Sequence, residues 1–143
     1  MDDTEPACET WTANPGYAMA ADPVWRLPAY RLALYALHVG WNDASALSRK
    51  SLTAPVGAQL YRALGSVAAN LAEGFSRSSG RDRVRLYEYA LGSARECVVW
   101  YRAALPLLEH VTVERRLVHL QRIVRLLLAV IPRERARNVT KTS

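Results

Sequence analysis

Residues 84–105 carry apolar side chains at alternating steps of three and four residues, and this spacing strongly constrains the fold. The positions are Val84, Tyr87, Leu91, Ala94, Val98, Tyr101 and Leu105. Because an α-helix turns once every 3.6 residues, side chains at this spacing lie on one face. Pro106 has no backbone N–H and stops the pattern. The stretch therefore predicts an amphipathic helix that needs partners for its apolar face.

Three other stretches repeat the pattern. Their apolar positions are Tyr30, Leu34, Leu37, Trp41, Ala44 and Ser48; then Leu60, Leu64, Val67, Leu71 and Gly74; then Val113, Leu117, Leu120, Val124, Leu127 and Ile131. Pro28 suits a helix start, and Thr53 and Thr112 suit helix caps. Pro132 is expected to end or kink the last helix. Four helices of about 22 residues joined by short loops predict an all-α, antiparallel up-down-up-down four-helix bundle over residues 28–137.

The ends of the chain lack this periodicity. Residues 1–27 contain Pro6, Pro15, Gly16 and Pro23, and we interpret them as a flexible acidic leader. We expect residues 138–143 to form a disordered tail. The acidic N-terminus does not look like a secretory signal, and no apolar run is long enough to span a bilayer. These features favour a cytoplasmic protein that does not enter membranes.

Charge is distributed unevenly. Residues 1–23 hold five acids and no base, whereas the rest of the chain holds all 19 Lys and Arg with eight acids. Seventeen of the bases are arginine, which binds phosphate or carboxylate with two parallel hydrogen bonds. A basic body suggests an anionic partner, although it also suits a merely soluble surface.

Two of the predicted helices carry small or apolar residues on a second face. On residues 84–105 the outward positions include Tyr89, Gly92, Val99 and Ala103, and on the preceding helix they are Ala63, Ala69 and Ala72. A helix that is apolar or small-sided all round is buried on more than one side. This favours a homo-oligomer, the alternative being an alanine-rich surface chosen for helix propensity.

Polar residues form a ladder beside the core of the second helix. Ser66, Asn70, Glu73 and Arg77 follow a 4-3-4 spacing, and Glu73 and Arg77 form a favourable i, i+4 pair. Antiparallel pairing with the third helix places Ser66 near Ser93, Asn70 near Tyr89 and Arg62 near Glu96. We interpret Asn70, Glu73, Arg77, Ser93 and Glu96 as residues of assembly and specificity.

The motifs Gln59-Leu-Tyr-Arg-Ala63, Ala69-Asn-Leu-Ala-Glu-Gly-Phe75 with Arg77, and Ala90-Leu-Gly-Ser93 with Glu96 resemble a family signature. The family is the four-helix bundle group named after the reading frame in the intervening sequence of 23S rRNA genes. It includes the accessory variability proteins of diversity-generating retroelements. The resemblance covers residues 29–131 and implies a homopentamer. Its retroelement members are basic and work with nucleic acid and a reverse transcriptase. The matched signature residues are Asn70, Glu73, Gly74, Arg77, Gly92, Ser93 and Glu96.

The chain shows no pattern typical of an enzyme. Glu73 and Glu96 are separated by about 15 Å along the predicted hairpin, too far for a shared metal or a paired acid and base. His38, His110 and His119 have no ligand spacing. We therefore expect no catalytic residue, no metal site and no cofactor.

The predicted topology gathers basic residues at the pole that contains the turn at Ser78–Gly80. The candidate nucleic-acid-binding residues there and along the last helix are Arg81, Arg83, Arg85, Arg115, Arg122, Arg125, Arg133, Arg135 and Arg137. We expect the acidic leader to sample this pole and to compete with an anionic ligand. One hypothesis is a non-enzymatic, sequence-tolerant accessory protein that binds RNA or DNA, working with a reverse transcriptase or rRNA. The alternative is an oligomeric protein–protein adaptor with no nucleic-acid role.

Overall fold

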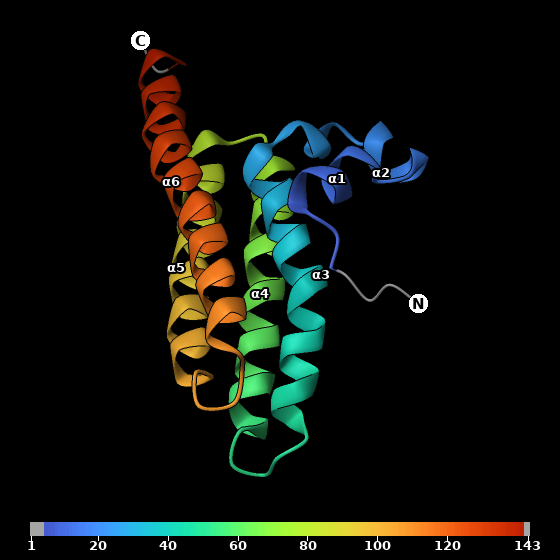
Figure 1. Cartoon of the computed structure of the whole chain (residues 1–143). Coiled ribbons are helices and arrows are strands. Elements are labelled where there is room, and N and C mark those ends of the chain that lie inside the picture. The colour runs from blue at the N-terminus through green and yellow to red at the C-terminus, as the bar shows by residue number, and fades with distance from the viewer. Residues whose placement is uncertain (1–4, 142–143) are drawn as a thin grey trace.

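The four long helices pack side by side into a bundle. The computed structural model describes the backbone of residues 5–141 and the side chains of residues 5–137. The helices are α3 (Pro28–Ser48), α4 (Ala54–Phe75), α5 (Gly80–Ala103) and α6 (His110–Lys141). Each runs in the opposite direction to the one before it, so that the loops after α3 and α5 lie at one pole and the loop after α4 at the other (Figure 1). The prediction of an all-α helical bundle is confirmed, and no strand occurs between residues 5 and 141.

Apolar side chains from all four helices fill the centre. Leu47, Leu64, Tyr101 and Leu127 are among the largest side chains that are fully buried. The stripes predicted for α4 and α5 face this core, with Leu60, Val67 and Leu71 fully buried on α4 and Val84, Tyr87 and Ala94 buried on α5. Ala63, predicted on an outward face, is also buried. Within the described residues no helix has both the length and the apolar character needed to cross a membrane.

The buried face of α3 differs from the prediction. Trp41, placed in the core from its spacing, is 58% exposed, whereas Ala33, Val39 and Leu47 are buried. The physical reason is that α3 has two apolar faces. One packs in the bundle, and the other is partly covered by the N-terminal segment, where the Trp25 ring contacts Tyr30.

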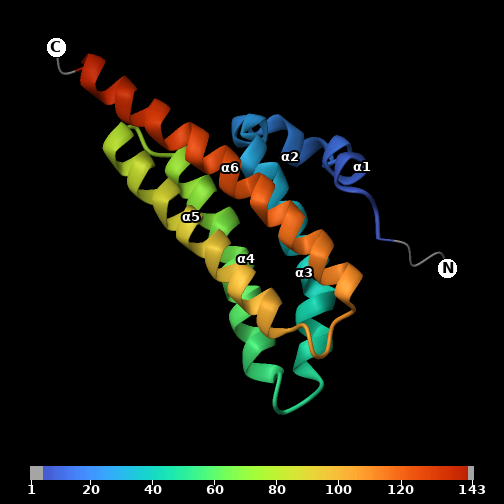
Figure 2. The ribbon, with the colours of Figure 1, turned by 60° about the vertical axis from the view of Figure 1, so that its left-hand side comes forward.

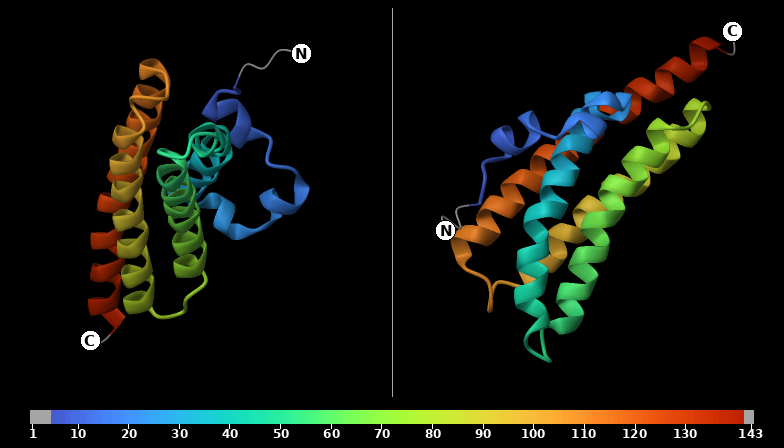
Figure 3. Two further views of the ribbon diagram at one scale, coloured as in Figure 1. Left: turned by 90° about the horizontal axis from the view of Figure 1, so that it is seen from below. Right: turned by 90° about the vertical axis from the view of Figure 1, so that its right-hand side faces the viewer.

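The N-terminal segment has regular structure, in contrast to the flexible leader predicted. It forms α1 (Cys8–Ala13), α2 (Tyr17–Ala21) and a 3-10 turn (Pro23–Arg26). Asp22 caps the 3-10 turn by accepting a hydrogen bond from the Val24 N–H at 3.0 Å. α1 and the 3-10 turn pack against α3, on the side of the molecule away from α5, and α2 contacts the 3-10 turn (Figure 3). Such short helices have weak periodicity, and α1 gains from its contact with α3 the stabilisation that it lacks alone.

α6 continues through Pro132, where the sequence predicted an end or a kink, and reaches Lys141. It extends past the ends of the other helices (Figure 2). Ion pairs on the far side of the proline hold it against α5: the Glu134 carboxylate lies 3.1 Å from Arg83, and Arg135 pairs with Glu88. Residues 138–141 of the predicted disordered tail are therefore helical. Residues 142 and 143 lie outside the described residues.

Two predicted helix caps also differ. Thr53 precedes α4, but its hydroxyl donates to the Leu47 carbonyl at 2.6 Å and does not cap the helix. Thr112 lies inside α6, which begins two residues earlier at His110. Neither threonine therefore caps its helix as predicted.

Candidate functional site

The basic pole is partly neutralised by ion pairs. Arg83 is largely buried; it pairs with Glu134 and also donates to the Arg77 carbonyl at 2.7 Å, so that it closes the turn between α4 and α5. Arg85 lies 3.7 Å from Asp82. These acids neutralise positive charge that was predicted to bind an anionic ligand. The other pairs at this pole are Arg77 with Glu73, Arg135 with Glu88, and Arg137 with Glu134.

A line of arginines along α6 is more open. Arg115, Arg122 and Arg133 are separated by 7 and 11 residues, close to whole numbers of helical turns, and all three are exposed. At 1.5 Å per residue the line is about 27 Å long. Arg125, also exposed, lies beside it. Arg122 is 3.6 Å from Glu9, while Arg115, Arg125 and Arg133 have no ion-pair partner among the described side chains.

The polar ladder between α4 and α5 forms only in part. The hydroxyls of Ser66 and Ser93 are 2.8 Å apart, as predicted, and the Asn70 amide donates to the Ser66 carbonyl at 2.9 Å. Glu73 and Arg77 form their i, i+4 pair on the exposed surface. Glu96 accepts a hydrogen bond from the Trp100 ring at 3.1 Å, and among the described side chains no bond joins it to Arg62.

The two signature glycines occupy different surroundings. Gly74 is buried, and a Cβ there would lie 2.8 Å from the Tyr87 ring, so this glycine allows α4 and α5 to approach closely. Gly92 is exposed, with nothing within 4 Å of an added Cβ.

A charged cluster lies inside the bundle. Asp43 on α3 and Arg116 on α6 are 6% and 7% exposed, and the Arg116 Nε donates to an Asp43 oxygen at 2.7 Å. The Tyr101 hydroxyl on α5 donates to the same oxygen at 2.7 Å. Burial and the Asp43 charge raise the pKa of Tyr101 well above its usual value. Asp43 thereby joins three helices.

The outer side of this cluster binds the N-terminal segment. Arg116 donates from Nη1 and Nη2 to the two carboxylate oxygens of Glu5, both at 2.7 Å. These hydrogen bonds hold the pKa of Glu5 below its ordinary value. Tyr35 donates toward the Pro6 carbonyl at 2.8 Å and lies 3.2 Å from Glu5. Burial and the nearby Glu5 raise the pKa of Tyr35 to about 12.

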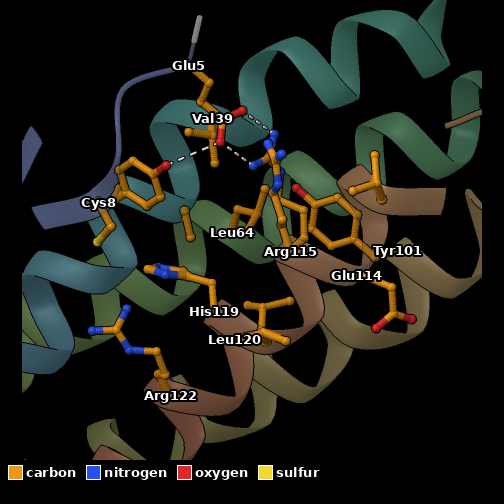
Figure 4. A pocket seen from close by; sticks show the side chains of 15 residues that line it. Glu5, Cys8, Val39, Leu64, Tyr101, Glu114, Arg115, His119, Leu120 and Arg122 are labelled. Atoms are coloured by element: carbon orange, nitrogen blue, oxygen red, sulfur yellow. Dashed lines mark hydrogen bonds and ion pairs between the residues drawn. The ribbon is translucent and has the colours of Figure 1, made fainter. Parts of the chain in front are cut away.

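A pocket of about 380 Å³ opens beside these contacts. Figure 4 shows Glu5 and Cys8 at its edge, with Arg115, His119 and Arg122 on α6. The His119 ring is held by its Nε2, 2.8 Å from the Leu32 carbonyl. Burial lowers the pKa of His119. Because a carbonyl oxygen only accepts, Nε2 is the donor in this bond.

Residues 44–129, more than half of the chain, match the family model described as 23S rRNA-intervening sequence protein. The chain belongs to this family. Neither the curated proteins nor the solved structures contain a significant match. The match confirms the resemblance carried by the motifs between Gln59 and Glu96.

The match to the intervening-sequence protein family covers only part of the buried cluster. It contains Tyr101 and Arg116 and begins one residue after Asp43, whereas Glu5 lies far outside it. None of these four residues was predicted as a site residue, and Tyr101 was placed only in the apolar stripe of residues 84–105. A lone Asp within an apolar helix and a lone Arg on the apolar side of another were the available signals, because such charges are buried only when paired.

Proposed function

We propose that this intervening-sequence protein is a non-enzymatic, cytoplasmic accessory protein that binds structured RNA through the α6 arginine line, Arg115, Arg122 and Arg133 with Arg125 beside it. The observation that carries the proposal is the straight, exposed line itself. A duplex presents one phosphate per about 1.7 Å of axis, so a line of about 27 Å faces many phosphates. The family's association with rRNA favours RNA over DNA.

The residues of this surface favour binding to the phosphate backbone of RNA over recognition of its bases. Arginine forms two parallel hydrogen bonds with a phosphate. Along the line the neighbouring exposed side chains are aliphatic, as in Val111 and Val118, and offer no aromatic platform for a base. Binding should therefore tolerate many sequences. A reverse transcriptase or the ribosomal transcript is the context we propose for that RNA.

Mobility-shift titrations of the full chain with a hairpin RNA and with duplex DNA, over a salt series from low to physiological, would test the proposal. The variant changes Arg115, Arg125 and Arg133 to glutamine. We expect its affinity to fall at least tenfold for every RNA sequence alike. Its log–log salt slope should become shallower by about 3, because each removed arginine leaves one phosphate without its protein cation.

The matched control changes Arg49, Arg62 and Arg102 to glutamine. These exposed arginines lie elsewhere on the bundle and have no ion-pair partner among the described side chains. The control removes the same charge and should keep most of the affinity. Equal reductions of affinity in the two variants, or no binding by the wild type at low salt, would favour the protein–protein adaptor.

We also propose that the protein is a homo-oligomer, a pentamer on family grounds, with the outer face of α5 in the contact. Tyr89 and Val99 are 55% and 58% exposed, and the small residues Gly92 and Ala103 on the same helix are exposed as well. Glu96 is also exposed on this face, and exposed apolar side chains beside small residues favour contact with another subunit.

Gly92→Leu should shift the protein toward smaller species in size-exclusion chromatography with light scattering. The added side chain meets nothing within the protomer, so helix content and melting of the single chain should hold. Gln121→Leu, on an exposed position of α6, is the control and should keep the wild-type mass. A wild type that is monomeric at micromolar concentration would contradict the assembly.

A further inference from the structure

Glu5 binds the bundle in the manner of a ligand. It belongs to a segment outside the four long helices, and its carboxylate takes two hydrogen bonds from one buried guanidinium. We infer that the groove between α3 and α6 is an acceptor site for an acidic peptide segment of a partner protein, and that residues 5–12 fill it as an internal occupant.

The receiving side of this site is built within the bundle. Asp43 accepts hydrogen bonds from the Tyr101 hydroxyl and from Nε and Nη2 of Arg116, which fixes the inner edge of the guanidinium. Nη1 and Nη2 also donate to the N-terminal segment. Within the described residues, every buried side-chain N or O atom has a hydrogen-bond partner. An arginine oriented in this way selects a carboxylate by its two parallel bonds.

The neighbouring contacts select the residues on the C-terminal side of the carboxylate. One residue after Glu5, the Pro6 carbonyl accepts from Tyr35, and three residues after it the Cys8 side chain is buried. Cys8 borders both the pocket of about 380 Å³ and a second one of about 460 Å³ toward the start of α3. The site therefore favours an acid and, three residues later, a small apolar side chain.

Charge also favours an acidic occupant. Within the bundle, Asp43 already balances the charge of Arg116, and the same pocket is lined by two further arginines, Arg115 and Arg122, against one further acid, Glu114. Without Glu5 the pocket therefore keeps a positive excess. Glu9 approaches Arg122 at 3.6 Å, so a second acid four residues after the first adds to the attraction. Apolar walls contributed by Val39, Leu64 and Leu120 suit a peptide better than a nucleic-acid backbone.

A labelled peptide with the sequence of residues 1–13 is the probe, measured by fluorescence anisotropy against three full-length chains: wild type, Glu5→Gln and Glu109→Gln. The tethered segment competes at an effective concentration in the millimolar range and should mask the site in the wild type. Glu5→Gln weakens that competitor while Asp43, Tyr101 and Arg116 stay paired. We expect it to bind the peptide at least tenfold more tightly than the wild type.

Glu109→Gln is the matched control because it removes the same charge from an exposed position just before α6. It should bind the peptide no better than the wild type. A peptide that itself carries Glu5→Gln should bind the Glu5→Gln chain at least tenfold more weakly than the native peptide. Circular dichroism should show unchanged helix content in both chains.

Equal peptide binding by the three chains, or equal binding of the two peptides, would overturn the inference. RNA binding that depends on Arg115, Arg125 and Arg133 is measured separately. The RNA-binding proposal and the peptide-site proposal can therefore be contradicted separately.

Discussion

Arg116→Met should lower the free energy of unfolding by about 3–5 kcal/mol, because it leaves the Asp43 carboxylate buried without its counter-charge. Arg116 is 7% exposed, and methionine fills similar space without offering a donor. The Tyr101 hydroxyl still donates to Asp43, but a single neutral donor does not compensate a buried charge. Urea unfolding followed by circular dichroism at pH 7 measures the change.

The adjacent residue provides a close control. Arg115 is exposed and has no ion-pair partner among the described side chains, so Arg115→Met should change the free energy of unfolding by less than about 0.5 kcal/mol. Similar destabilisation by the two substitutions would contradict the structural role of the buried cluster. It would indicate that residue 116 is accessible to water in solution.

The second large effect is expected at Gly57, where α4 crosses α3. A Cβ at this position would lie 2.8 Å from the Ala44 carbonyl oxygen and 3.1 Å from the Leu47 Cβ. Backbone cannot move aside as a side-chain end can, so the two helices must separate. We expect Gly57→Ala to lower the free energy of unfolding by about 1–3 kcal/mol, despite the better helix propensity of alanine.

Gly65→Ala on the same helix is the control, because it changes helix propensity in the same way without changing the packing of α4. Nothing lies within 4 Å of an added Cβ there, so this substitution should raise the free energy of unfolding by about 0.5–1 kcal/mol. Thermal and urea unfolding of the two variants, compared at equal protein concentration, would decide. If both variants gained stability, the close approach of α3 and α4 at Gly57 would be wrong.

The arginines show where prediction from sequence was limited. Their abundance is evident from the sequence, and helical spacing correctly indicates that Arg115 and Arg122 share a line on α6. Arg83 was predicted as a nucleic-acid-binding residue, but it is largely buried against Glu134, 51 residues away. An ion pair between helices depends on their relative rotation, and local spacing carries no information about that rotation.

The sequence alone determined four helices, their approximate bounds, the buried faces of α4 and α5, and the family, because periodicity and short motifs are local properties. The tertiary structure decided which face of α3 is buried, that the N-terminal segment packs against it, and that Asp43, Arg116 and Glu5 meet. Those three residues are far apart in sequence. The apolar surroundings of Asp43 and Arg116 indicate burial, but the local sequence does not identify the partner of either. Only the stacking of α3, α5 and α6 brings them within hydrogen-bond distance, where burial makes their pairing obligatory.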